Sequence, residues 1–458
     1  MTTPLLERNV VRLSQISIGR AILSLAMPIV LSNTLVIGHQ LANAFWLWKL
    51  GTTAVAAVSV TFPVICLLVA FGGGFAAAVS ILVSRFAGAG NRVAVAHVSA
   101  QGLAIVLILS FLLSGIGYVA VRPLLQVMGV ASDVLFNAIT YMRLSIISIV
   151  PMFAFAMFQS ILRGTGETKL PLYLMTGSVI INLILDPLFI FGWGPVPSNG
   201  VAGAGYATLI AEGLAASVAL GILYGGYCST SIRLRIYFPD LTFIQRIVAL
   251  GLPISIEQSS SALGAMVITG FVAHFGTIAI AAYGIGLRVL MLILIPALGI
   301  STAAHTLVGQ NIGAGNFTRA RQTAIVSASY AFAVLAAAAV LVYAGATDII
   351  KLFVPTAATA VISEGSRVLH AMAVAFAFFG VEMSFAGTFR GAGDTLVPMI
   401  FAMISIWLIQ IPAAFVLSHF TSLREQGLWC SFPISAIGSA LLAVARFRTG
   451  RWMLAIGA

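Results

Sequence analysis

Residues 177–194, GSVIINLILDPLFIFGWG, place Asp186 inside an apolar run long enough to cross a lipid bilayer. An ionised carboxylate at that depth costs at least roughly 2.5 to 3.5 kcal/mol on insertion scales, so it persists where it faces a cavity, a partner or a transported ion. No Lys or Arg lies within one helical turn of Asp186 to pair with it. We therefore predict a functional site around Asp186; a structural, ion-paired aspartate is the alternative.

Polar residues around Asp186 follow the period of a helix. Ser178, Asn182 and Asp186 recur at four-residue spacing, which predicts one polar stripe facing a helix bundle. Pro187 follows directly. Because proline has no N–H, it leaves the carbonyl of Leu183 without its helical partner and predicts a bend beside the carboxylate, as in transporter ion sites at interrupted helices.

The composition of the whole chain is that of a polytopic membrane protein. Of the 458 residues, 60% are hydrophobic and only 8% are charged, and the mean hydropathy is +1.09. Apolar segments of spanning length predict an all-α protein with about twelve transmembrane helices. The expected spans are 21–48, 53–84, 97–121, 134–162, 170–193, 201–224, 247–275, 279–309, 322–345, 366–389, 396–417 and 428–446.

The net charge of +11 is distributed by the positive-inside rule, which argues against nucleic-acid binding. With both termini in the cytoplasm, sixteen of the 23 Lys and Arg residues fall in inner segments and five in outer loops, while Arg143 and Arg288 lie within spans. No cleavable signal is evident at the N-terminus. We expect a multi-pass protein of the inner (plasma) membrane with both termini cytoplasmic.

Metal, disulfide and nucleotide signals are missing from the sequence. Cys66, Cys228 and Cys430 have neither paired nor metal-ligand spacing. Neither a nucleotide-binding loop nor a carboxylate cluster of the DxxD kind occurs, which disfavours ATP-driven transport and an integral-membrane transferase. We expect no catalytic residues, no metal and no cofactor, and therefore no enzyme.

The second half of the chain repeats the first at an offset of 225 to 227 residues. Because each half holds an even number of spans, the repeats share one topology and are related by an axis along the membrane normal. The prediction is an N-terminal six-helix lobe over 1–225, a cytoplasmic linker over 226–245 and a C-terminal six-helix lobe over 246–458. The matched residues are Pro28 and Pro253, Gly51 and Gly276, Gly88 and Gly313 (both GAGN), Arg163 and Arg390, Pro187 and Pro412, and Gly200 and Gly427.

Two repeated motifs mark cytoplasmic helix ends. In each GAGN, glycine permits the left-handed turn that ends a helix and asparagine can cap the next one. The RGTGET and RGAGDT corners contain Arg163 and Arg390 and are expected to specify topology rather than chemistry.

Taken together, the paired RGxG(E/D)T corners, the NLILDPLFIFG helix followed by GVAGAGYAT, and AAHTLVGQNIGAGN resemble the multidrug and toxic compound extrusion (MATE) family over nearly the whole chain. The prokaryotic DinF-like branch is most similar, through Asn182 and Asp186. The resemblance implies a V-shaped pair of six-helix bundles that exports organic, often cationic, compounds in exchange for protons or sodium.

The resemblance also implies roles for individual residues. Asp186 matches the family's fifth-helix aspartate, and Asn182 its hydrogen-bonding neighbour. Tyr141 matches a tyrosine that opens the fourth helix and faces the same pocket. Pro28 sits where the family's first helix bends on cation binding, and we place a second hinge at Pro187.

The first helix departs from the family pattern, because NAFWLWKLG places Asn43 where a second acidic residue is usual. With one carboxylate, the site can still take up a proton, whereas sodium would lose a charged ligand and rely on neutral oxygens. We therefore favour protons over sodium. His39, one turn before Asn43, is a secondary candidate for a second titrating group; a histidine satisfied by a backbone carbonyl is the alternative.

Three further carboxylates fall within apolar runs and are secondary candidates: Glu257, Glu212 and Glu382. Glu257 is expected to bind cationic substrate or a proton, or to be a structural residue facing the cytoplasm. Arg288 is expected to pair with Glu257 or Glu382, and Arg143 to snorkel toward an interface.

The sequence thus predicts a monomeric secondary antiporter that exports an amphipathic, cationic small organic substrate across the bilayer in exchange for protons. The alternatives are a sodium-coupled exporter of the same family and a lipid-linked oligosaccharide flippase of the same superfamily. The flippase requires clustered Arg or Lys for pyrophosphate, and only Arg143 and Arg288 lie in spans.

Overall fold

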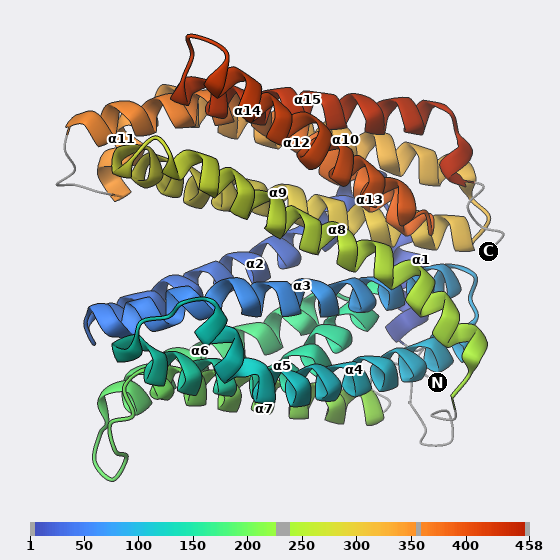
Figure 1. The fold of residues 1–458 in the computed structure, drawn as a ribbon. Coiled ribbons are helices and arrows are strands. Elements are labelled where there is room, and N and C mark those ends of the chain that lie inside the picture. The colour runs from blue at the N-terminus through green and yellow to red at the C-terminus, as the bar shows by residue number, and fades with distance from the viewer. Residues whose placement is uncertain (1–4, 226–238, 354–358, 454–458) are drawn as a thin grey trace. The chain divides into compact units, whose positions relative to one another are not determined.

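The computed structural model describes residues 5–225, 239–353 and 359–453, which are almost entirely helical (Figure 1). The first half contains α1 (Leu5–Gln15), α2 (Ile18–Trp48), α3 (Thr52–Gly88), α4 (Arg92–Val127), α5 (Ser132–Gly164), α6 (Lys169–Phe191) and α7 (Val201–Tyr224). The second contains α8 (Leu241–Ala273), α9 (Thr277–Gly313), α10 (Phe317–Ala344), α11 (Ala346–Phe353), α12 (Thr359–Gly391), α13 (Leu396–Met403), the π-helix Ile404–Gln410, α14 (Ile411–His419), α15 (Glu425–Arg448) and the short 3-10 helix Arg451–Met453.

Eleven helical segments in the described ranges are long and apolar enough to cross a membrane, and α13, the π-helix and α14 together form one of them. The 33-residue α8 is long enough but falls outside this set, because Glu257, Gln258 and three serines lower its hydropathy. It supplies the twelfth helix of spanning length. The prediction of an all-α membrane protein is confirmed.

The chain divides into two compact units whose ends do not follow the sequence halves. Unit 1 contains residues 1–12 and 31–255, and unit 2 contains residues 13–30 and 256–458. Both α2 and α8 therefore belong partly to each unit. The divisions in these helices fall two residues after Pro28 and two residues after Pro253, which are the first matched pair of the repeat.

The first part of α2 packs into the core of unit 2. Its buried Ile22 and Leu25 belong to one apolar cluster with Ile300 and Leu307 of α9. A Cβ added at Gly299 would collide with this segment at Val30.

The first part of α8 packs into unit 1 in the same way. The Oγ of Ser255 donates to the carbonyl of Phe71 at 2.6 Å, and a Cβ at Gly74 would collide with Ser255. Ile247 is fully buried in the main apolar cluster of this unit. Gly74 and Gly299 are 225 residues apart, so the two exchanged segments are held by equivalent glycines.

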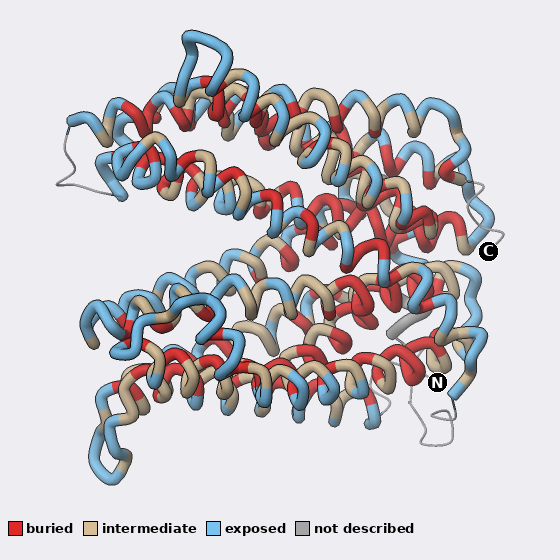
Figure 2. The backbone as a smooth tube through the Cα atoms, viewed as in Figure 1, coloured by how far each residue is buried: buried red, intermediate tan, exposed pale blue. Residues whose placement is uncertain are grey.

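Each unit is organised around one central helix. In unit 1, α5 packs against α3, α4 and α7, and in unit 2, α12 packs against α9, α10 and α15. Most positions along both helices are buried or half-buried (Figure 2). The helices α5 and α12 end in the matched RGTG and RGAG corners, so the two cores are built on equivalent elements.

Equivalent backbone turns confirm the repeat at atomic detail. Gly90 and Gly315, the second glycines of the two GAGN motifs, have φ of 70° and 74°. The side chains of Asn91 and Asn316 then accept backbone N–H bonds of 3.0 Å each, from residues three positions later. The expected asparagine caps are therefore confirmed at the starts of α4 and α10.

The match between Gly200 and Gly427 needs correction. A Cβ at Gly427 would collide with the backbone of Leu417. In the first half, the glycine that packs in this way is Gly203, where a Cβ would collide with the backbone of Phe189. Gly200, which precedes α7, instead corresponds to Arg424, which precedes α15: their φ values are 54° and 50°. Because several glycines lie close together before and within α7, the sequence did not reveal this three-residue shift in the alignment of the two halves.

The predicted linker over 226–245 is described only at its end, since residues 226–238 lie outside the described ranges. Asp240 precedes α8 and accepts backbone N–H bonds from Thr242 and Phe243. Its carboxylate also lies 3.1 Å from Nε2 of His97 on α4. The division into six-helix lobes at these positions stays a prediction.

Candidate functional site

The polar stripe on α6 lies inside unit 1. Ser178, Asn182 and Asp186 are all buried, and Asp186 has no exposed surface. Ser178 donates to the carbonyl of Ala211 at 3.4 Å, which places this face of α6 against α7. The expectation that the stripe points into the bundle is confirmed. Pro187 lies inside α6, which continues as a helix to Phe191.

A histidine from α2 completes the group. The Nε2 of His39 lies 3.9 Å from Oδ2 of Asp186, and the imidazole is 18% exposed. His39 is therefore partly exposed, whereas the neighbouring carboxylate of Asp186 is fully buried. The sequence named His39 as a second titrating group, and the structure places it next to Asp186.

Asn182 lies against both groups. With the amide nitrogen toward the pair, it donates to both Asp186 oxygens at 3.0 Å and to Nε2 of His39 at 2.9 Å. The reverse orientation would turn the amide oxygen toward acceptors alone, so this is the orientation that satisfies the amide. The other end of the amide lies 3.5 Å from Oγ1 of Thr208.

Asn43 and Tyr141 lie at the same end of unit 1. The Oδ1 of Asn43 is buried and has no hydrogen-bond partner among the described residues. Tyr141 packs against the apolar cluster that includes Leu47 and Ile190, and interacts electrostatically with Asp186. The sequence placed this tyrosine at the opening of its helix; the structure corrects this, because α5 begins nine residues earlier at Ser132.

Thr208 is the residue of this site that the sequence reasoning missed. It lies on α7, one turn from Ala211, and contacts the Asn182 amide. The signal was present in the GVAGAGYAT segment, which ends in Thr208, but only the packing of α6 against α7 shows which of its residues faces Asn182.

A second acidic group lies in unit 2 and has a different chemistry. Nη2 of Arg390 lies 2.5 Å from Oε1 of Glu257, and the two side chains are 22% and 12% exposed. Oε2 of Glu382 accepts a 2.6 Å bond from Oγ of Ser439. The charges of Glu257 and Arg390 act on Glu382 as well.

The partner of Glu257 differs from the expectation. The sequence suggested that Arg288 pairs with either Glu257 or Glu382, and it assigned Arg390 to topology alone. Arg390 is the partner in the structure, at the end of α12 where the RGAGDT corner begins. The RGAGDT corner therefore also supplies the cation that pairs with Glu257, which the sequence did not predict.

The remaining candidate acid, Glu212, lies on α7 one turn after Thr208. Its Oε2 is buried and lacks a partner among the described residues, and no described contact joins it to Asp186. Pro28 lies inside α2, two residues before that helix passes from unit 2 to unit 1. In the described part of the chain, no three His, Cys, Asp or Glu side chains are grouped so as to hold a metal ion.

Comparison with known proteins agrees with this architecture. The family described as MatE matches residues 28–188 and 253–416, which is one match in each half of the chain. A crystal structure of MATE in the straight conformation superposes with a TM-score of 0.92 over 100% of both chains at 23% sequence identity. This likeness supports the predicted two-lobe, twelve-helix fold.

Two relatives cover nearly the full length. A Bacillus subtilis protein named probable multidrug resistance protein YoeA is 31% identical over 434 residues, which are 94% of this chain and 93% of the relative. A Shewanella oneidensis protein named FAD transporter is 28% identical over 431 residues, 91% and 92% of the two chains. The chain therefore belongs to the MatE family of multidrug efflux transporters.

Proposed function

We propose that this transporter exports amphipathic, cationic organic compounds in exchange for protons, with Asp186 as the coupling carboxylate. The observation that carries the proposal is a fully buried carboxylate that contacts a histidine and an amide and, among the described residues, forms no ion pair with a Lys or Arg. Burial without a permanent counter-charge favours the neutral carboxylic acid, so proton uptake and release can change the state of the site.

The surrounding side chains favour a proton over sodium. Hard cations prefer several oxygen ligands, and here one place around Asp186 is taken by the nitrogen of His39. Asn43 contributes a neutral oxygen where the family pattern has an acid. A proton needs only one acceptor, and His39 offers a second acceptor 3.9 Å away.

The proposed mechanism is alternating access, in which the protonation state of Asp186 selects the packing of α2 and α6. Protonation removes the charge, the Asn182 amide turns its oxygen toward the acid, and α2 bends at Pro28 while α6 repacks at Pro187. The two prolines are suited to this role because neither residue donates the helical hydrogen bond of its position. The pocket beside Asp186, which the family resemblance implies for the N-terminal lobe, then shrinks and releases substrate.

We further propose that the chain is a monomer in the inner membrane, with both termini in the cytoplasm. The distribution of Lys and Arg between predicted inner and outer segments supports this orientation.

The direct test is efflux of a fluorescent organic cation from inverted vesicles, with a proton gradient and a sodium gradient imposed separately. Wild-type protein should respond to the proton gradient, and Asp186→Asn should lower the rate at least about a hundredfold, which is roughly 2.7 kcal/mol of coupling. Asp348→Asn is the matched control, because that aspartate is 87% exposed. Full proton-driven efflux by Asp186→Asn would overturn the proposal.

Two outcomes would favour the alternatives. Efflux driven only by sodium would identify the sodium-coupled exporter. No cation efflux under either gradient would direct attention to a lipid-linked oligosaccharide or to an anionic organic substrate, and the relative named FAD transporter makes FAD the first competitor to assay.

A further inference from the structure

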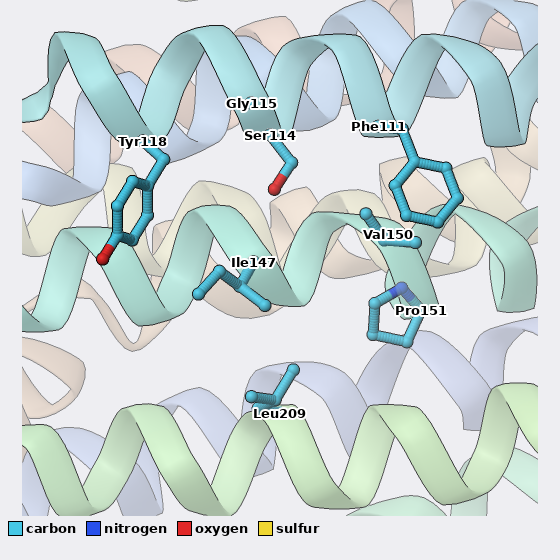
Figure 3. Close-up of a pocket in the computed structure, with 8 residues that line it drawn as sticks. All are labelled: Phe111, Ser114, Gly115, Tyr118, Ile147, Val150, Pro151 and Leu209. Carbon is cyan, nitrogen blue, oxygen red and sulfur yellow. The ribbon is translucent and has the colours of Figure 1, made fainter.

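A groove in unit 1 is lined by α4, α5 and α7, and Asp186 is not among its lining residues (Figure 3). Its volume is about 580 Å³, which is within the range of sites that hold small organic ligands. Phe111, Ser114 and Tyr118 project from α4 toward α5, and Leu209 projects from α7 (Figure 3). The remaining lining residues are Gly115, Ile147, Val150 and Pro151.

The groove is open and apolar rather than a closed part of the core. Phe111 is 63% exposed and Tyr118 is 40% exposed. In a helix bundle of this hydropathy, such a surface is covered by lipid. Two arginines lie on the helix faces that line the groove. Arg122 follows Tyr118 by one turn on α4, and Arg143 precedes Ile147 by one turn on α5.

Arg143 contacts Tyr118, one of the residues that line the groove. Its guanidinium carbon lies 4.6 Å from the centre of the Tyr118 ring, which forms a cation–π contact. The Nε of Arg143 is buried and has no hydrogen-bond partner among the described residues. None of the described ion pairs joins Arg143 to a carboxylate. Among the residues that the structure describes, the guanidinium therefore has no anionic partner, and it lies beside an apolar groove.

The position of Arg143 along α5 fits the polar boundary of a bilayer. The 33 residues of α5 extend about 50 Å at 1.5 Å per residue, about 20 Å more than a hydrocarbon core. With the excess length shared equally between the two ends of α5, the boundary of the hydrocarbon core lies about 10 Å along the helix from Ser132. Arg143 lies roughly 16 Å along the helix from Ser132, which is just inside that boundary. A snorkelling arginine spans the difference, so its guanidinium reaches the depth of lipid phosphates.

We infer that this groove binds one anionic glycerophospholipid, with an acyl chain along Phe111, Val150 and Leu209 and the phosphate against Arg143. Arginine suits this ligand because its planar fork can donate two hydrogen bonds to a phosphate. Arg122, on the same side of α4 one turn further, adds a second positive charge at the headgroup end. The site does not depend on the coupling carboxylate or on the identity of the exported substrate.

The test is native mass spectrometry of the full chain released from detergent micelles, with phosphatidylglycerol or phosphatidylcholine of identical acyl chains added. Wild-type protein should hold one phosphatidylglycerol about tenfold more tightly than phosphatidylcholine. Arg143→Gln should remove this preference. Lys351→Gln, which removes the same charge from a surface pair with Asp348, should leave it unchanged.

A second variant tests the binding of the acyl chain separately from the binding of the headgroup. A Cβ at Gly115 would have no atom within 4 Å, so Gly115→Leu introduces an apolar side chain into the groove at an open position and without loss of helix propensity. It should weaken both lipids, while size-exclusion profile and melting temperature stay as in wild type. Unchanged phosphatidylglycerol binding in both Arg143→Gln and Gly115→Leu would overturn the inference. Loss in Gly115→Leu alone would also overturn it, since the groove would then hold a neutral apolar molecule.

Discussion

The two acidic groups of this transporter belong to repeated halves but have opposite electrostatic designs. In unit 1, Asp186 faces His39 and Asn182, neither of which carries a permanent positive charge. In unit 2, Glu257 faces the permanent cation Arg390 at 2.5 Å. A buried carboxyl beside no permanent cation can gain or lose a proton without breaking an ion pair, whereas the ion pair in unit 2 depends on the charge of its carboxylate. The repeat therefore supplies one scaffold twice, and we interpret only the first copy as a coupling site.

The largest effect is expected from breaking the ion pair of unit 2. Arg390→Gln leaves Glu257 charged, largely buried and without a cation, which should lower the free energy of unfolding by roughly 2 to 3 kcal/mol, less than for a fully buried pair because both side chains are partly exposed. Thermal melting in detergent measures this. Arg390→Gln combined with Glu257→Gln should recover most of the loss. A double variant as unstable as the single one would show that the pair has another role.

A smaller effect is expected at the histidine of unit 1. His39→Gln removes the second proton acceptor beside Asp186 but keeps a polar side chain, so proton-driven efflux should fall about tenfold, roughly 1.4 kcal/mol, without loss of folded protein. His370→Gln is the matched control, because His370 is a half-buried histidine of unit 2 whose Nε2 lies 3.1 Å from the carbonyl oxygen of Tyr343. Equal rates for both histidine variants would contradict a coupling role for His39.

The residues that precede α7 and α15 allow one backbone position to be compared between the two halves. Gly200 and Arg424 share φ near 50°, a region in which a side chain costs of order 1 to 3 kcal/mol. Arg424→Gly should therefore raise the free energy of unfolding by about 1 kcal/mol, allowing for the greater freedom of glycine in the unfolded chain. Arg424→Ala should give no comparable gain, because it keeps the Cβ. Equal stabilisation by both would mean that the charge, not the backbone, was responsible.

The smallest effect concerns how the two shared helices are anchored at their starts. His97 hydrogen-bonds to Asp240 before α8 and is the largest cause that holds the pKa of this carboxyl below its ordinary value of 3.8. A lowered carboxyl pKa stabilises the fold above the ordinary pKa, and that contribution is lost as the pH falls through the lowered value. The anchor of α2 is different, since Arg319 donates to the carbonyls of Leu13 and Ile16.

Hydrogen exchange should consequently show that α8 loses protection at its start below about pH 3.8, while the start of α2 does not. Asp240→Asn should remove this pH dependence. An equal acid response at the start of both helices would show that the His97–Asp240 pair is not its origin.

Features that repeat within one helix or at a fixed offset could be predicted from the sequence. The stripe of Ser178, Asn182 and Asp186 follows from the helical period, and the asparagine caps follow from the GAGN motifs. The contact of His39 with Asp186 and the pairing of Arg390 with Glu257 join helices far apart in the chain, and no periodicity selects such partners. The Gly203–Gly427 match was missed because only backbone collisions distinguish Gly203 from its neighbour Gly200.

Because the first part of α2 belongs to unit 2 and the first part of α8 to unit 1, dividing the gene between the two halves should impair folding. A chain split within residues 226–238 would give two fragments, and each would carry a helix segment that completes the other. The first fragment would lack the segment with Ile247 and Ser255, and the second would lack the segment with Ile22 and Leu25. Neither fragment would then have a full core when produced alone, whereas co-expressed fragments would complement each other. The two halves of this transporter are thus duplicated in sequence but interdependent in folding.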